Sequence, residues 1–191
     1  MTEAPKKKNR VVSVFDGSNF HICLKNMALP TRLHYTKLSI EVAKKLPKEL
    51  EPWEFVRTFY VTSSPIEEDN PTAFKDWQVF QDMLSKTERL ELRLGRREGA
   101  RGARKEKGVD TIITTTLLAG AYQDAYDVAL LFTSDGDFAD AVDAVRAIGK
   151  RVFNVFHRSH RSYHLGKACT GSIELDKFDL NRFKFYQYRR Y

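Results

Sequence analysis

The segment Val128–Gly149, VALLFTSDGDFADAVDAVRAIG, narrows the possible folds more than any other part of the chain. The apolar run Val128–Phe132 has the length and continuity of a strand that is buried on both faces. An amphipathic helical pattern follows almost at once and ends at Gly149, a residue type that commonly follows a helix. A buried strand that leads directly into a helix predicts one βα unit of a parallel sheet.

The rest of the chain repeats this alternation. Strands are predicted at 11–15, 53–62, 89–94, 127–134, 150–156 and 172–178, and helices at 33–46, 72–87, 109–122, 137–149 and 161–170. The repeated order predicts an α/β protein with a doubly wound, mainly parallel sheet and helices on both faces. A length of 191 residues fits one domain. We place this domain at 10–180, between a basic N-terminal tail (1–9) and a basic, aromatic C-terminal segment (181–191).

Acidic residues follow two of the predicted strands, where ligands bind in such sheets. Asp16 follows the first strand, whereas Asp135 and Asp137 follow the segment 127–134. Asp110 stands at the start of a predicted helix. If the strands are neighbours, these carboxylates converge, and a hard divalent cation such as Mg²⁺ or Mn²⁺ would offset their repulsion. Such an ion lowers the pKa of a bound water and stabilises the charge that grows on a phosphodiester.

Each acid taken singly has a simpler structural interpretation. Asp137 is a favourable N-cap for a helix that begins at Phe138, and Asp16 with Gly17 could form an ordinary turn. Capping needs only one acid for each helix, however, whereas here one acid stands on each side of a glycine. Asp135 is therefore the residue that capping leaves unexplained.

Positive charge is concentrated in two segments, and the net charge of +7 favours a polyanionic partner. The segment 93–107, RLGRREGARGARKEK, lacks apolar periodicity and is predicted to be a mobile loop that grips an RNA backbone. Its cations are Arg93, Arg96, Arg97, Arg101, Arg104, Lys105 and Lys107. The C-terminal NRFKFYQYRRY interleaves cations with aromatic residues, which suits single-stranded nucleic acid but also fits an edge strand.

Other classes of protein fit the sequence less well. A phosphatase of the haloacid dehalogenase type would need its nucleophilic Asp where Val14 stands, and no Walker A loop is present. The apolar runs are far shorter than the roughly 20 residues of a membrane span, so no membrane partner is expected. Cys23 and Cys169 lack metal-type spacing and favour free thiols in the cytoplasm. The histidines of HRSHRSYH are predicted to be solvated or to face phosphate.

Three motifs resemble the NYN domain, a branch of the PIN-like nucleases that includes LabA-like proteins. They are VFDGSNF, KGVDTIITTTLLAGAY and LLFTSDGDFADAVDAVRAIGKRVFNVF, and their order and spacing match over about residues 10–180. The resemblance implies a PIN-like, three-layer αβα fold and a ribonuclease site that depends on Mg²⁺ or Mn²⁺. The implied metal ligands are Asp16, Asp110, Asp135 and Asp137, and the implied orienting residues are Asn19 and Ser134. The chain departs from many relatives at Thr116 and Thr170, where an Asp is common.

Two hypotheses of different classes follow. The first is a metal-dependent ribonuclease that hydrolyses phosphodiester bonds of RNA, with single-stranded RNA as the expected partner and the cytoplasm as the expected location. The second is a non-cleaving RNA-binding or regulatory module with a degenerate PIN-like site. Cleavage assays with and without a chelator distinguish the two, and a homo-oligomer is compatible with both.

Overall fold

A central sheet organises the fold of the protein in the computed structural model, which describes residues 6–185. Its strands are β1 (Asn9–Asp16), β2 (Trp53–Ser63), β3 (Leu90–Glu98), β4 (Lys105–Lys107), β5 (Val128–Phe132), β6 (Arg151–Phe156) and β7 (Gly171–Glu174). They lie side by side in the order β4-β3-β2-β1-β5-β6-β7. Neighbouring strands run parallel, apart from the antiparallel pair β3 and β4. The predicted mainly parallel sheet is confirmed.

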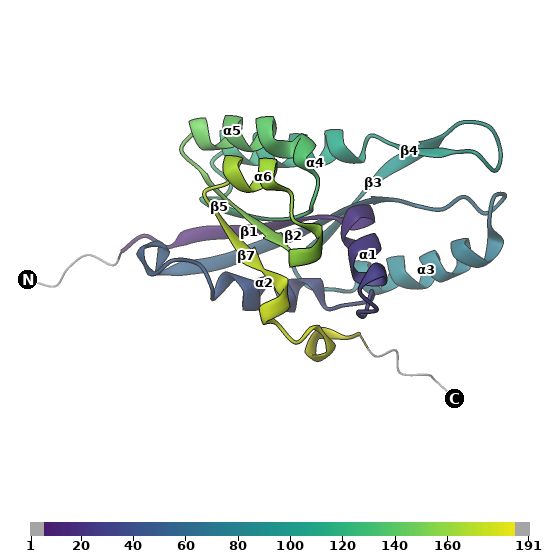
Figure 1. Cartoon of the computed structure of the whole chain (residues 1–191), viewed down its shortest axis with the longest axis horizontal. Coiled ribbons are helices and arrows are strands. Elements are labelled where there is room, and N and C mark those ends of the chain that lie inside the picture. The colour runs from purple at the N-terminus through teal and green to yellow at the C-terminus, as the bar shows by residue number, and fades with distance from the viewer. Residues whose placement is uncertain (1–5, 186–191) are drawn as a thin grey trace, which may run out of the picture.

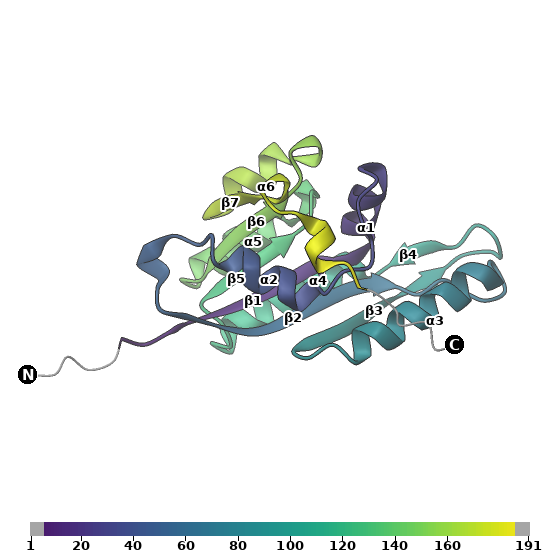
Figure 2. The same ribbon diagram turned by 90° about the horizontal axis from the view of Figure 1, so that it is seen from below.

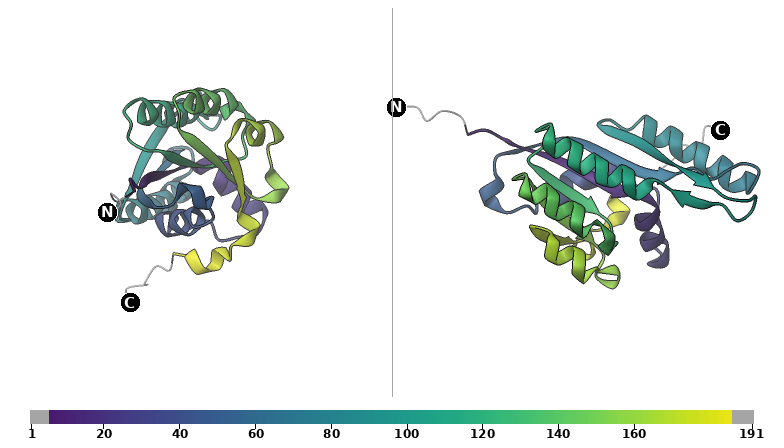
Figure 3. Two further views of the ribbon diagram at one scale, coloured as in Figure 1. Left: turned by 90° about the vertical axis from the view of Figure 1, so that its left-hand side faces the viewer. Right: turned by 90° about the horizontal axis from the view of Figure 1, so that it is seen from above.

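Helices cover both faces of the sheet (Figures 1 and 3). They are α1 (Gly17–Asn26), α2 (Tyr35–Ala43), α3 (Pro71–Ser85), α4 (Val109–Tyr122), α5 (Ala139–Ala147) and α6 (Tyr163–Ala168). Short 3-10 turns lie at η1 (Lys48–Leu50), η2 (Gly136–Phe138), η3 (Arg158–His160), η4 (Leu175–Lys177) and η5 (Leu180–Phe183). The left view of Figure 3 shows the three layers, with α4 and α5 on one side of the sheet and α2 on the other. The predicted αβα architecture is therefore also confirmed.

Two hydrophobic cores hold these layers together, one on each face of the sheet. Alternate residues of a strand point to opposite faces, so β1 contributes to both cores. Val11 and Phe15 pack in the core formed with α1, α2 and α3, whereas Val12 and Val14 pack in the core formed with α4, α5 and α6. Double-sided burial explains why the central strands are almost continuously apolar in sequence.

The chain reverses its direction of winding between β1 and β5. From β1 it passes to β2 and β3 on one side, and from β5 to β6 and β7 on the other. The helices that follow β1 and β5 therefore diverge to opposite faces of the sheet. Open α/β sheets bind ligands in the crevice that such a switch point creates at the carboxyl ends of the strands. Asp16 and the turn that begins at Thr133 stand at this point.

The basic segment 93–107 forms a hairpin, so the prediction of a mobile loop was wrong. β3 extends to Glu98 and pairs with β4, which opposes Arg97 to Glu106 and Glu98 to Lys105. Two of the three cross-strand pairs join opposite charges and the third joins Arg96 to Lys107, so the hairpin has no apolar pattern that could signal a strand. Gly99 and Gly102 make the turn with φ angles of 126° and 78°, which favour glycine. Figure 2 shows the hairpin projecting beside α3.

The ends of the predicted domain differ from expectation in detail. Asn9 already belongs to β1, and the Lys6 ammonium donates a hydrogen bond of 2.8 Å to the Glu51 carbonyl. The part 181–185 of the C-terminal segment forms the end of η5 and one isolated bridge between Lys184 and Leu33, so it is not an edge strand of the sheet. The remainder of that segment, 186–191, lies outside the described residues.

No helix within residues 6–185 is long and apolar enough to cross a membrane. Cys23 and Cys169 are both buried and unpaired.

Candidate active site

Asp16 is the most deeply placed acid at the switch point. It ends β1, caps the N-terminus of α1, and is 4% exposed. One carboxylate oxygen accepts a hydrogen bond of 3.1 Å from the Asn19 backbone N–H, and the other accepts one of 3.0 Å from the Thr133 hydroxyl. A Cβ atom at Gly17 would lie 2.5 Å from the Tyr60 ring, so only glycine allows α1 to start this close to β2. The sequence prediction of a simple turn at this position missed α1.

A chain of hydrogen bonds joins the turn after β1 to the turn after β5. The side-chain oxygen of Asn19 accepts a bond of 3.0 Å from the Ser134 backbone N–H. The Thr133 hydroxyl, which donates to Asp16, accepts a bond of 3.1 Å from the Asp135 backbone N–H. Asn19 and Ser134 thus hold the two turns in register, with Ser134 contributing its backbone to this bond.

Asp135 is the capping residue of its turn, so two expectations were wrong: that Asp137 is the cap, and that capping leaves Asp135 unexplained. The Asp135 carboxylate accepts a hydrogen bond of 2.9 Å from the Asp137 backbone N–H and caps the 3-10 turn η2. α5 begins only at Ala139, and its N-cap residue Phe138 makes no side-chain cap. The 3-10 turn shifts the helix start beyond both acids. Asp137 is left exposed, and its carboxylate has no hydrogen-bond partner within residues 6–185.

A third segment of the chain brings two further carboxylates to the site. Asp110 lies in the first turn of α4, where the helix dipole favours a negative charge. Glu106 comes from β4, and its carboxylate accepts hydrogen bonds of 2.7 Å from Ser18 and 2.5 Å from Ser63. Sequence reasoning missed Glu106, because its position depends on the hairpin in place of the predicted loop.

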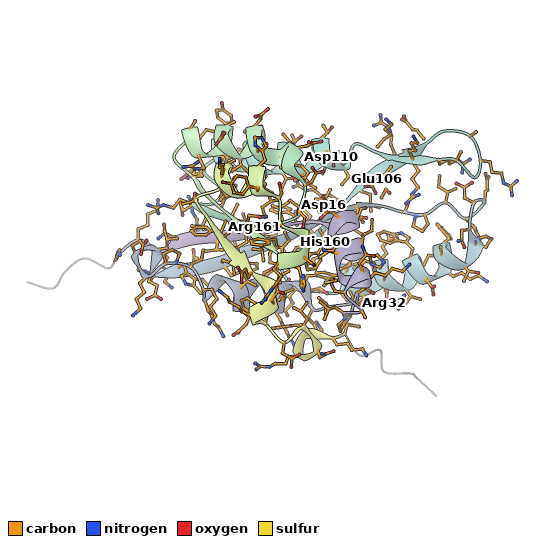
Figure 4. The ribbon with its side chains drawn as sticks, viewed as in Figure 1. Asp16, Arg32, Glu106, Asp110, His160 and Arg161 are labelled. Carbon is orange, nitrogen blue, oxygen red and sulfur yellow. The ribbon has the colours of Figure 1, made fainter. Side chains whose placement is uncertain are left out.

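The five carboxylates form one electrostatic group, of which Figure 4 labels Asp16, Glu106 and Asp110. Burial, together with the charges of Asp110 and Glu106, raises the pKa of Asp16 to about 6, although its hydrogen bonds act in the opposite direction. Partial desolvation raises the pKa of Asp110, and the charges of Asp135, Glu106 and Asp137 add to this effect. Within the described chain, none of the five is in an ion pair with Lys, Arg or His. No ion pair within residues 6–185 therefore neutralises the negative charge of the site.

The chemistry of this donor set fits a hard divalent cation. All five groups are carboxylates, the ligand type that Mg²⁺ and Mn²⁺ prefer, and an added positive charge would relieve the repulsion that raises the pKa of Asp16 and Asp110. In the described residues, no three His, Cys, Asp or Glu side chains stand in an arrangement that could already hold a metal ion. The site therefore has the negative charge and the oxygen donors that a metal ion needs, but its side chains are not yet arranged as a set of ligands.

The predicted RNA-binding cations separate into two groups. The first group is engaged in contacts within the protein. Arg93 contacts Glu91 at 2.8 Å and Thr116 at 2.6 Å, Arg104 contacts Glu68 and Asp69, and Arg96 pairs with Glu98. The second group, without an ion-pair partner in the described chain, consists of Arg97, Arg101, Lys105 and Lys107. The surface available to a polyanion is thus smaller than the sequence suggested.

The two threonines where relatives often carry Asp lie in different places. Thr116 is buried on α4, where its hydroxyl accepts a hydrogen bond from Arg93 and donates to the Ile112 carbonyl. Thr170 precedes β7 and accepts a hydrogen bond of 3.1 Å from the Val152 N–H near the amino end of β6. Thr170 therefore stands at the edge of the sheet opposite the acids, and its identity does not alter their surroundings.

The histidine-rich loop between β6 and α6 packs beside the turn that carries Asp135. A Cβ atom at Gly136 would lie 3.2 Å from the Ser162 hydroxyl oxygen. His157 contacts the Asp176 carboxylate at 3.2 Å, which gives this histidine a structural role. His160 hydrogen bonds locally with the Ser159 hydroxyl at 2.9 Å.

A doubly wound sheet with carboxylates grouped at its switch point is an arrangement that the PIN-like nucleases share. Within this class, the chain belongs to the NYN domain family, whose model matches residues 11–176. The general function is therefore that of a nuclease, and nucleases of this kind generally use divalent metal ions. The chain is also similar in structure to a protein of unknown function from Vibrio parahaemolyticus, with a TM-score of 0.69 and 15% sequence identity. That match covers 91% of this chain and 97% of the other, and supports the fold. No curated protein matches the chain.

Proposed function

We propose that this protein is a ribonuclease that hydrolyses RNA phosphodiester bonds with the help of Mg²⁺ or Mn²⁺. The observation that carries the proposal is the group of five carboxylates, which have no ion-pair partner among residues 6–185 and one of which, Asp16, is buried. A protein that used these acids only for capping would gain nothing from placing their charges together. A bound metal cofactor would neutralise these carboxylates, and the metal would then attract the negatively charged phosphodiester of the substrate.

The carboxylates of Asp16, Asp110, Asp135 and Asp137 would hold the cation, and Glu106 would complete their group. When bound, Mg²⁺ or Mn²⁺ supplies an activated water and stabilises the charge that develops on the phosphodiester. Asn19 and Thr133 keep the two acidic turns at a fixed separation through their hydrogen bonds. The exposed cations of the hairpin β3–β4 would contact phosphates on either side of the bond that is cut.

Chelation tests this function directly. In excess EDTA, we expect cleavage of a labelled single-stranded RNA to stop, and we expect Mg²⁺ or Mn²⁺ to restore it. Asp135→Asn should behave like the chelated protein in the presence of metal, because it removes one carboxylate but keeps a side chain that caps well. The exposed helical residue Asp143 offers the matched control Asp143→Asn, which should cleave normally. RNA that is bound but never cut with any divalent ion would support the non-cleaving RNA-binding module instead.

Two lysines of the hairpin should contribute to binding through phosphate contacts. We expect the double variant Lys105→Ala, Lys107→Ala to weaken RNA binding for all sequences and to reduce the slope of log affinity against log salt by about 1 for each lysine. Fluorescence anisotropy over a range of NaCl concentrations measures this slope. Arg96→Ala is the matched control on the same hairpin, because the Arg96 guanidinium is already paired with Glu98. An unchanged slope in the double variant would exclude the two lysines from phosphate contact.

A further inference from the structure

A cavity of about 600 Å³ opens beside the acidic group, between α1, α3 and the end of β2. Its volume lies in the range of pockets that bind small molecules or single groups of a larger ligand. Gly17, which directly follows Asp16, forms part of its wall. The cavity is therefore adjacent to the acidic site.

The cavity and the acidic site share a wall of hydroxyl groups. Ser18, Thr62 and Ser63 line the cavity. The hydroxyls of Ser18 and Ser63 also donate to the Glu106 carboxylate, and Ser18 lies 3.2 Å from the Thr62 hydroxyl. A ligand that occupied both the cavity and the acidic site would contact these hydroxyl groups between the two.

The opposite part of the cavity is apolar and aromatic. Ile22 of α1 lines it and is 55% exposed, so its side chain is available to a ligand. Trp77 and Phe80 of α3 also line it, with their rings in an edge-to-face contact at 5.8 Å. A flat aromatic ligand would gain both apolar burial and ring contacts here.

The charge around the cavity is positive. Lys25, Arg32 and Arg97 line it, against the single acid Asp76 among its lining residues. Arg32 donates to the Asp76 backbone carbonyl at 3.2 Å, which leaves its charge unneutralised, and Lys25 and Arg97 have no ion-pair partner in the described chain. Arg97 lies opposite Glu106 across the hairpin, so the two side chains share one face. Figure 4 shows Arg32 at the end of α1 remote from Asp16.

We propose that this cavity binds one unpaired nucleotide of the RNA strand, next to the phosphodiester at the acidic site. The proposal rests on the proposed ribonuclease function. The base lies against Ile22 and the partly exposed Phe80, with the buried Trp77 behind them, and the phosphates lie near Lys25, Arg32 and Arg97. Aromatic contact with a base combined with cations along the backbone is the general chemistry of single-strand recognition. A base held in a duplex cannot enter, because both of its faces and its pairing edge are occupied, so the substrate is unpaired at this nucleotide.

The intrinsic fluorescence of Trp77 provides a test that needs no cleavage. The chain has two tryptophans, and Trp53→Phe leaves Trp77 as the reporter. In this background and in EDTA, we expect octauridylate to quench the fluorescence, and a duplex of the same length to bind at least about tenfold more weakly. Ile22→Glu should lower the affinity for octauridylate by about tenfold or more, through loss of the apolar wall and repulsion of phosphate.

Val79→Glu is the matched control. Val79 is an apolar residue of α3 that is 39% exposed and lines a different cavity, so this variant should bind octauridylate as well as the parent. Equal affinity of the Ile22→Glu variant and its parent would overturn the proposal, as would equal affinity for the duplex. Cleavage with Mn²⁺, assayed separately on the parent protein, reports on the ribonuclease function. If the parent cleaves RNA but Ile22→Glu does not weaken binding, the proposed nucleotide site in the cavity is refuted and the ribonuclease function is not. If Ile22→Glu weakens binding but the parent does not cleave RNA, the ribonuclease function is refuted.

Discussion

The variant Asp16→Asn is expected to lose RNA cleavage by about 100-fold or more and, at the same time, to be more stable than the parent in the absence of metal. The loss follows from removal of the one buried carboxylate of the site. The gain follows from the pKa of Asp16, which burial raises from 3.8 to about 6. Asparagine is also a good N-cap, so α1 keeps its first hydrogen bond.

The size of the stability effect depends on pH. Between pH 4 and 6, folded Asp16 retains a proton that the unfolded chain has released, so stability falls as the pH rises through this interval. Above pH 7 the whole cost is present, and its size is about 3 kcal/mol. Asparagine carries no charge at either pH, so its advantage should be largest above pH 7 and should shrink toward pH 4.

Urea unfolding in EDTA at pH 7.5 and pH 4.5 measures the change in stability of the Asp16→Asn variant. An assay with Mn²⁺ measures its loss of RNA cleavage. Asp143→Asn is the control, because Asp143 is an exposed acid further along α5 whose surface pair with Arg146 contributes little, so neither quantity should change. A variant at Asp16 that is less stable at pH 7.5 than the parent would show that the native hydrogen bonds outweigh the burial of charge. Undiminished cleavage would remove Asp16 from the active site.

Phe132→Ala should be the most destabilising single change beneath the site, at a cost of about 3–5 kcal/mol. Phe132 is fully buried at the end of β5 and stacks on Phe15 of β1, with ring centroids 3.8 Å apart. The same contact supports the backbone immediately before Thr133, whose hydroxyl orients Asp16. We therefore expect the variant to lose cleavage even at temperatures where it remains folded.

Thermal unfolding together with cleavage below the midpoint temperature tests this expectation. Phe153→Ala is the matched control, since Phe153 is buried on the same face of the sheet but aligns with Leu130, further from the carboxyl ends of the strands. It should destabilise the protein and leave cleavage by the folded fraction unchanged. Phe132→Leu, with a smaller change in volume, should preserve both. If the folded Phe132→Ala protein cleaves like the parent, the contact between Phe132 and Phe15 is not needed to position the acids.

Sequence reasoning succeeded where the decisive pattern is local. The buried run at Val128–Phe132 and the helix after it can be recognised without knowledge of the remaining chain. Because parallel strands end at the same edge, the sequence alone also indicates that Asp16 and Asp135 lie near one another. The first inference, repeated along the chain, was sufficient to predict the layers and the sheet, and the second placed Asp16 and Asp135 at one edge of it.

Sequence reasoning failed where one residue type serves several structures. Asp16-Gly17-Ser18-Asn19 consists of residues that favour turns, and the same types favour helix starts, so α1 was missed. Asp135 and Asp137 are both good caps, and a short 3-10 turn decides between them. Glu106 gave no signal within the basic segment, because charge pairing across a hairpin leaves no apolar periodicity.

The strand order also determines when the parts of the carboxylate group come together during synthesis. The hydrogen bond between Thr133 and Asp16 joins residues 117 positions apart, and β1 stays unpaired on one side until β5 has been made. Chains fold from the N-terminus as they leave the ribosome, and pairings between distant strands form late. A growing chain that ends before β5 carries Asp16, Glu106 and Asp110 but not the turn that completes the site. The strand order therefore delays completion of the carboxylate group until β5, the fifth strand of the chain, has been synthesised.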